Sequence, residues 1–244
     1  MKNWKKQIVI GLFICILGIG GASYAYINDY YHADTAAMEA LQSNKAVQII
    51  EKEKQVIFQG KNSKSGIIFY PGGKVEYTAY APLLHQLAEE GMTCILLHMP
   101  GNLAVFDMNA ADGIKEQYPE IQTWYMAGHS LGGSMAASYM GKHEEEFQGL
   151  ILLAAYSTED LSDTDLEVLS LYGSEDGVLN REKYKKYESN LPQNTKEYSI
   201  EGGNHGQFGS YGLQEGDGKA EISAEEQVER TVDAIEALVL KNNN

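Results

Sequence analysis

The sequence has little cysteine and little positive charge, and both shortages narrow what the chain can be. It contains 2 cysteines in 244 residues, Cys15 and Cys94. Each lies in an apolar run, so neither is placed to form a disulfide within a domain, and the fold must rest on its hydrophobic core. Lysine and arginine number 19 against 34 aspartates and glutamates, a formal net charge of −15. This balance argues against nucleic acid and anionic lipid headgroups as partners.

Sequence motifs of metal and cofactor chemistry are also missing. The chain has no zinc-protease pattern, no phosphate-binding loop and no dinucleotide fingerprint, and it shows no internal repeat or low-complexity tract. Three aspartates, Asp160, Asp163 and Asp165, match the spacing of no calcium loop and are typical of an acidic surface loop. We therefore expect no metal and no cofactor.

One stretch near the start lacks charged residues altogether. After the basic run Met1–Lys6 no charge occurs until Asp29, and the apolar segment from Gln7 to about Asn28 exceeds the roughly 20 residues that span a bilayer. Lysines before it predict a cytoplasmic N-terminus and an exported remainder, a single-pass anchor. The alternative is a cleaved signal peptide and a secreted protein, since Ser23-Tyr24-Ala25 resembles a cleavage site. Both readings place the rest of the chain outside the cytoplasm.

The remaining length suits one α/β domain. Residues 1–28 form the anchor or signal segment, residues 29–45 predict a juxtamembrane helix or stalk, and residues 46–244 predict the folded domain. Its expected strands are a hairpin over 46–51 and 55–59, then 66–70, 93–98, 123–127, 150–155, 166–172 and 195–200. Its expected helices are 77–90, 104–117, 131–140, 181–189 and 223–240. This alternation predicts a mostly parallel sheet with helices on both faces.

The most informative motif is the G-x-S-x-G run Gly128–Gly132, which lies between an expected strand and an expected helix. A strand, a sharp glycine turn and a helix form the context that a nucleophile elbow requires. The two glycines allow strand and helix to pack closely, so the turn can hold Ser130 in a strained, exposed conformation. Ser130 is therefore the candidate nucleophile.

A serine needs a base and an orienting carboxylate, which follow it in the order acid, then histidine, in this architecture. Asp176 follows an expected strand and precedes Gly177, a tight-turn signal, and the neighbouring Glu175 is the alternative acid. His205 lies in a glycine-rich loop after the last strand. His98, at the end of another strand, is the competing base, and chain order favours His205.

An oxyanion hole completes the expected site. One backbone N–H should come from Leu131, directly after the nucleophile. The other should come from the loop after the 66–70 strand, where Gly73 is our candidate and Lys74 the alternative. Glycine there lets the backbone approach a substrate carbonyl closely.

Three segments together resemble the α/β-hydrolase superfamily: Phe69–Val75, Met99–Ala104 and Gly128–Gly133. With Gly202–Gly212, they resemble more narrowly the small hydrolases of fold family 5, near the dienelactone hydrolases. The resemblance extends from about Val56 to the C-terminus and implies Ser130 as nucleophile, Asp176 as acid and His205 as base. Dienelactone hydrolases use a cysteine nucleophile where this chain has serine, which argues against a dienelactone substrate.

The short connection between residues 155 and 166 leaves no room for a cap domain, so we expect an open site without a lid. The sequence thus predicts a serine hydrolase working through an acyl-enzyme, a carboxylesterase for a small-molecule ester or an acylated cell-surface molecule. The alternatives are an anchored binding or scaffold domain without turnover, and an acyltransferase using the same triad. The sequence leaves the oligomeric state open.

Overall fold

The computed structural model describes residues 4, 8, 18, 20, 21 and 25–240. The chain divides into two compact units, Met1–Tyr30 and Tyr31–Asn244. Among the described residues, no helix combines the length and the apolar character needed to cross a membrane. Most of the expected anchor, Gln7 to about Asn28, lies outside the described residues. Anchor and cleaved signal therefore both remain expectations from the sequence.

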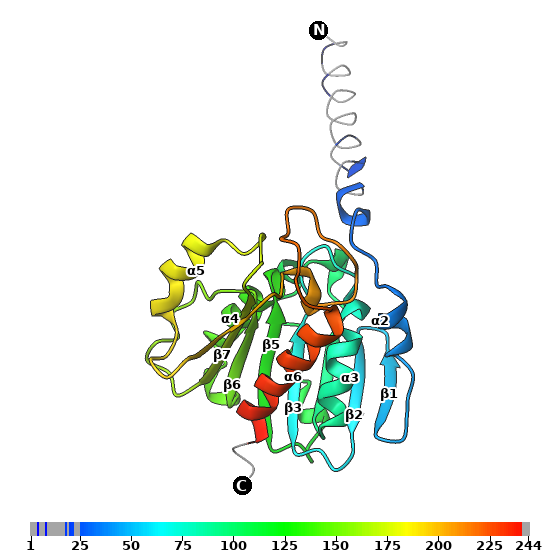
Figure 1. Ribbon diagram of the computed structural model, residues 1–244, viewed down its shortest axis with the longest axis vertical. Coiled ribbons are helices and arrows are strands. Elements are labelled where there is room, and N and C mark those ends of the chain that lie inside the picture. Colours follow the sequence, from blue (N-terminus) through cyan, green and yellow to red (C-terminus); the bar gives the residue numbers. More distant parts are fainter. Residues whose placement is uncertain (1–3, 5–7, 9–17, 19, 22–24, 241–244) are drawn as a thin grey trace. The chain divides into compact units, whose positions relative to one another are not determined.

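Eight strands form one sheet in the order β1-β2-β4-β3-β5-β6-β7-β8 (Figure 1). The hairpin β1 (Val47–Lys52) and β2 (Gln55–Gly60) is antiparallel, and β2 also runs antiparallel to β4 (Thr93–Leu97). All other neighbours are parallel: β3 (Ser65–Tyr70), β5 (Thr123–His129), β6 (Gly149–Leu153), β7 (Glu167–Gly173) and β8 (Lys196–Ile200). This confirms the predicted hairpin followed by a mostly parallel sheet.

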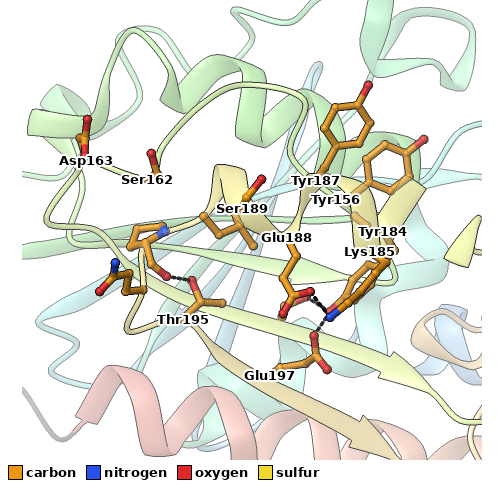
Figure 2. A pocket seen from close by; sticks show the side chains of 15 residues that line it. Tyr156, Ser162, Asp163, Tyr184, Lys185, Tyr187, Glu188, Ser189, Thr195 and Glu197 are labelled. Atoms are coloured by element: carbon orange, nitrogen blue, oxygen red, sulfur yellow. Dashed lines mark hydrogen bonds and ion pairs between the residues drawn. The ribbon is translucent and has the colours of Figure 1, made fainter. Parts of the chain in front are cut away.

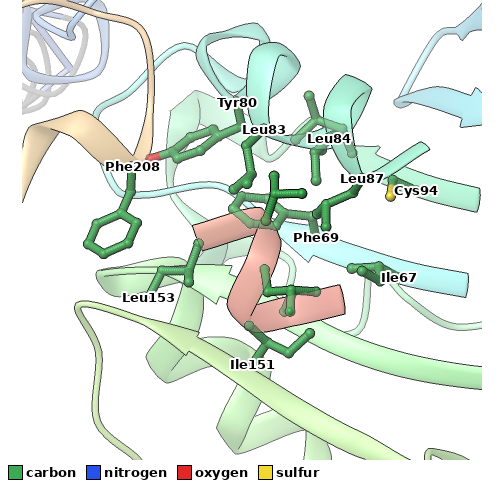
Figure 3. Packing of buried hydrophobic residues seen from close by; sticks show 14 of the residues in the cluster. Ile67, Phe69, Tyr80, Leu83, Leu84, Leu87, Cys94, Ile151, Leu153 and Phe208 are labelled. Atoms are coloured by element: carbon green, nitrogen blue, oxygen red, sulfur yellow. The ribbon is translucent and has the colours of Figure 1, made fainter. Parts of the chain in front are cut away.

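Helices cover both faces of the sheet because both faces are apolar. Consecutive strand residues point to opposite faces, so Ile67 joins one core and Ile68 the other. On the first face lie α3 (Ala81–Glu89) and α6 (Ala224–Val239). Figure 3 shows the leucines of α3 packed in this core. On the second face lies α4 (Leu131–Met140).

The last crossover helix, α5 (Arg181–Tyr187), lies on the same face as α4. Ser170 of β7 pairs with Leu152, whose side chain belongs to the α4 core, and its hydroxyl hydrogen-bonds Tyr184 Oη at 2.8 Å. The connection from β6 to β7, residues 154–166, contains no helix or strand. The helix that a βαβ crossover usually carries is therefore missing at this point.

One predicted helix, residues 104–117, is wrong. The segment instead forms short 3₁₀ turns, Ala104–Phe106 and Lys115–Gln117, joined by turns in which N–H groups bond carbonyls three residues back. Gly113 has φ +70°, which ends any helix there. The Tyr70 hydroxyl also donates to the Met108 carbonyl at 2.6 Å, which fixes the turn against β3. Local turn chemistry and this long-range bond therefore replace the predicted helix.

The predicted helix 77–90 begins instead with a 3₁₀ turn, Tyr77–Tyr80, and becomes α-helical from Ala81. Pro82 lies in the first turn of that helix, where its missing N–H costs no intrahelical bond. The predicted last helix is confirmed, and Ser223 caps it by accepting from the Glu226 N–H at 3.1 Å.

The segment expected to form a stalk, residues 29–45, belongs mainly to the larger unit, which begins at Tyr31. Tyr31 donates its N–H to the Lys74 carbonyl at 2.8 Å, and Asp34 donates its N–H to the Ser210 carbonyl at 2.9 Å. Asp34 also caps α2 (Thr35–Glu39). Residues from Tyr31 onward are thus bonded to loops at the carboxyl edge of the sheet rather than extending from the domain.

Candidate active site

Ser130 forms the turn between β5 and α4 with φ 51° and ψ −121°, a backbone conformation that residues other than glycine rarely adopt. Its N–H bonds the Leu153 carbonyl at 2.9 Å. A Cβ on Gly128 would lie 2.6 Å from the Gly132 backbone, and one on Gly132 would overlap the Pro71 carbonyl oxygen. These glycines therefore allow the close packing that the sequence predicted, because side chains there would push strand and helix apart.

His205 and Asp176 form a buried pair. Nδ1 of His205 and Oδ2 of Asp176 are 2.9 Å apart, and both side chains are buried. Because an ionised carboxylate only accepts hydrogen bonds, Nδ1 carries a proton, and in the neutral imidazole Nε2 is then the acceptor. That Nε2 is buried and has no hydrogen-bond partner within the described residues. A histidine in this state can take a proton from a hydroxyl placed against it.

The environment of Asp176 keeps it ionised. Burial raises its pKa, but the bond from His205, attraction to His205 and two backbone N–H groups lower it more, so the pKa lies below its ordinary value. The two N–H groups belong to Leu179 and Val178, which donate to Oδ1 at 2.7 and 2.9 Å. The loop after β7 thus stabilises the charged form that orients His205.

The two rival residues from the sequence lie in other environments. Glu175 accepts a bond from the Ser174 hydroxyl at 3.0 Å, and it is Asp176 that bonds His205. His98 is exposed and stacks on Tyr77, with ring centroids 4.4 Å apart. The structure therefore brings His205 together with Asp176. It contains no hydrogen bond from Ser130 to His205 Nε2, and such bonds are often long before substrate binds.

The loop after β3 meets the start of α4, as expected for an oxyanion hole. A Cβ on Gly73 would lie 2.7 Å from Leu131 Cδ2, so the two candidate residues are in contact. The neighbouring N–H groups are occupied, because Gly72 donates to Tyr80 Oη at 3.0 Å and Lys74 donates to the Asn102 carbonyl at 2.9 Å. No hydrogen bond of the Gly73 N–H is found among the described residues. Gly73 is thus the available donor of this loop.

Two residues that the sequence analysis did not assign join the loop after β3 (Pro71–Lys74, the candidate oxyanion loop) to the elbow. The buried Tyr80 hydroxyl accepts from Gly72 and lies 2.8 Å from His129 Nδ1. His129 precedes Ser130, and its ring lies 4.5 Å from the His205 ring, centroid to centroid. Burial, and then repulsion from His205, hold the pKa of His129 well below its ordinary value. His129 is therefore neutral, and Tyr80 is placed to donate to it.

A cavity of about 600 Å³ lies elsewhere, beside α5 (Figure 2). The connection after β6 forms another wall, and Tyr156 stacks on Tyr187 with ring centroids 5.6 Å apart. The residues that line this cavity do not include Ser130, Asp176 or His205. It occupies part of the face that the missing crossover helix would cover.

A strained serine turn after β5 and a histidine–aspartate pair from the loops after β7 and β8 give the layout of the α/β-hydrolase class. The sequence comparison agrees: the model of the alpha/beta hydrolase family matches residues 66–229. The chain belongs to this family. Among curated proteins, no sequence match is found.

Solved structures share the fold at low sequence identity. A predicted CIB-like hydrolase from Thermoplasma acidophilum is 19% identical, with a TM-score of 0.55 over 79% of this chain and 98% of its own. Est1E from Butyrivibrio proteoclasticus is 14% identical, with a TM-score of 0.56 over 80% and 99%. A Pyrobaculum calidifontis esterase is 13% identical, with a TM-score of 0.59 over 83% and 88%. These similarities concern the fold.

Proposed function

We propose that this chain is a serine carboxylesterase that works through an acyl-enzyme. The observation that carries the proposal is the buried His205–Asp176 pair, whose free acceptor Nε2 has no partner among the described residues. The ring of His205 lies against His129, the residue directly before the strained Ser130. A base of this kind beside a serine turn supports acyl transfer more than it supports passive binding.

In the proposed reaction, Ser130 Oγ attacks the ester carbonyl carbon while His205 Nε2 takes the hydroxyl proton. The N–H groups of Leu131 and Gly73 stabilise the negative charge that develops on the carbonyl oxygen. His205 then gives its proton to the departing alcohol, which leaves an acyl group on Ser130. Water, activated by the same histidine, releases the acid. Asp176 holds the imidazole in the required tautomer throughout.

The substrates that we propose are short acyl esters, or esters exposed on a larger molecule. Support comes from the connection 154–166, which has no helix or strand that could form a cap. Without a cap, a long acyl chain finds little apolar enclosure. We expect kcat/KM on p-nitrophenyl esters to decrease as the acyl chain lengthens.

A fluorophosphonate probe tests the nucleophile. We expect wild type to be labelled, Ser130→Ala to be unlabelled, and kcat/KM on a p-nitrophenyl ester to fall at least about 10⁴-fold in that variant. Ser134→Ala is the matched control, because this serine lies one turn later on α4 and its hydroxyl donates to the Tyr156 carbonyl. Labelling of Ser130→Ala, or no hydrolysis by folded wild type, would contradict the proposal.

We also propose that the enzyme works outside the cytoplasm. The support is in the sequence: lysines precede an uncharged segment that is long enough to span a bilayer. Protease added to intact cells should digest the hydrolase domain. The N-terminal residue of the mature protein then separates the two forms, because a retained anchor keeps the uncharged segment from Gln7, whereas a signal cleaved after Ala25 leaves Tyr26 as the first residue.

A further inference from the structure

A second carboxylate, Asp217, lies between the loop that carries Asp176 and the loop that carries His205. Its Oδ1 accepts the N–H groups of Gly177 at 3.1 Å and His205 at 3.2 Å. Its Oδ2 accepts the N–H of Gly206 at 2.8 Å. Gly177 directly follows the candidate acid and Gly206 directly follows the candidate base. One side chain therefore fixes the backbone of both loops, at the candidate base itself and at the residues directly after the acid and the base.

The backbone around Asp217 is packed as tightly as its hydrogen bonds suggest. A Cβ on Gly177 would lie 2.6 Å from the Gly216 carbonyl oxygen, and a Cβ on Gly218 would overlap the Glu175 carbonyl oxygen. On the other side, the Asn204 amide donates to the Gly218 carbonyl at 2.9 Å. The segment Gly216–Gly218 thus fills the space between the acid turn and the base turn, with glycine wherever backbones meet.

We propose that Asp217 is a positioning residue that sets the separation of Asp176 and His205. This inference rests on the proposed function, because it assigns the pair to catalysis. N–H groups from two loops converge on one carboxylate, which accepts charge-assisted hydrogen bonds. Without Asp217 these donors lose their acceptor, and the two loops lose their common anchor. A displacement of about 1 Å in a reacting group can cost about 10²-fold in rate.

The test uses Asp217→Asn and Asp217→Ala in the full chain. Asparagine keeps the shape but replaces one acceptor oxygen with a donor, which faces N–H groups that are donors as well. We expect kcat to fall about tenfold for Asp217→Asn and about 100-fold for Asp217→Ala, with KM changed less than about threefold. Glu215→Gln is the matched control, since it removes one exposed negative charge from the same loop and should leave kcat within about twofold.

A spectroscopic readout separates positioning from general loss of stability. The proton between His205 Nδ1 and Asp176 Oδ2 should give a downfield NMR resonance, which we expect to shift or broaden in folded Asp217→Asn and to persist in Glu215→Gln. If Asp217→Ala does not fold, Gly218→Ala tests the same packing of Gly216–Gly218 between the acid turn and the base turn. This variant should also lower kcat more than it changes KM. Folded Asp217→Asn with wild-type kcat, or with an unchanged resonance, would overturn the inference.

If the proposed function itself were wrong, the experiments would give a different set of results. If Ser130→Ala retained full hydrolysis, the assignment of the nucleophile would be wrong, and the kinetic arm would have no bearing on Asp217. The NMR arm would still decide whether Asp217 holds His205 against Asp176. If Ser130→Ala is inactive and Asp217→Ala is as active as wild type, only the positioning role fails.

Discussion

The two halves of the candidate site are held in place by different interactions. Around Ser130, the contacts are steric: Gly128 and Gly132 leave no room for side chains, and the turn follows from close packing of β5, α4 and the oxyanion loop. Around Asp176 and His205, the contacts are hydrogen bonds, which run from several backbone N–H groups to two carboxylates. The first half is a local motif. The second is assembled from loops about 30 residues apart.

Because of this difference, substitutions in the two halves should have different effects on stability and catalysis. A side chain added at the elbow must displace a strand or a helix, so folding and catalysis suffer together. A carboxylate removed from the acid and base loops leaves the sheet intact, so catalysis should suffer more than stability. The following three substitution experiments are ordered by the size of the effect that we expect.

The strongest perturbation of the steric half is Gly132→Ala. Because its Cβ would overlap the Pro71 and Tyr70 carbonyl oxygens, α4 must move away from the oxyanion loop. We expect kcat/KM to fall about 10²-fold and the free energy of unfolding to fall by about 1–3 kcal/mol. Ester hydrolysis and urea unfolding measure the two effects.

Gly141→Ala provides the control for that experiment. Gly141 ends the same helix with φ −59°, and its Cβ would meet only the flexible Glu159 side chain at 3.3 Å. It should keep wild-type activity and stability. Equal losses in Gly141→Ala and Gly132→Ala would show that α4 tolerates no added methyl anywhere, and that the elbow glycines are not special.

A smaller effect is expected for Tyr80→Phe, which removes the hydroxyl between Gly72 and His129. Two buried polar groups lose their partner, so the free energy of unfolding should fall by about 1–3 kcal/mol. The oxyanion loop loses one of its anchors, and we expect kcat to fall about tenfold with little change in KM. Steady-state kinetics would disprove this link if kcat stayed at the wild-type value in folded Tyr80→Phe.

The smallest effect is a difference in pH dependence between the two halves. His129 has a lowered pKa, so below its ordinary value of about 6.5 the unfolded state binds a proton that the folded state does not. Stability is then lost as the pH falls below about 6.5. Asp176 also has a lowered pKa, and its contribution is present above about 3.9 and lost as the pH falls through the folded-state value.

Urea unfolding from pH 7.5 to pH 3.5 separates these contributions. His129→Gln should begin to flatten the decrease in stability at about pH 6.5, whereas Asp176→Asn should begin to flatten it only at about pH 4. The comparison would fail if both variants began to depart from wild type at the same pH.

The sequence was most predictive where a short segment determines its own geometry. The elbow is marked in the sequence by the strand before it and the glycines within it, and the buried strands are marked by short apolar runs. Helix 104–117 failed because the Tyr70 hydroxyl, some 40 residues away, bonds its backbone. Asp217 was missed for the same reason: Gly216–Gly218 indicates a turn, but its contacts with Gly177 lie 40 residues back.

The neutral state of His129 could not be predicted either. Its position inside the G-x-S-x-G motif says nothing of its burial, which comes from the packing of Tyr80, Phe208 and His205 around it. Tyr80 precedes His129 by 49 residues, and His205 and Phe208 follow it in one loop after β8. Burial and pairing of this kind become visible only when the sheet has brought its loops together.

The order of the strands has a consequence for how the protein is made. Synthesis runs from the N-terminus, and Ser130 follows β5, a central strand, whereas Asp176 and His205 follow β7 and β8, the last two strands of the sheet. Asp217 comes later still, shortly before α6. A nascent chain can therefore complete the elbow long before it has a base to activate it. On the proposed function, turnover is then the last property that the growing domain acquires, because Ser130 is synthesised before both its acid and its base.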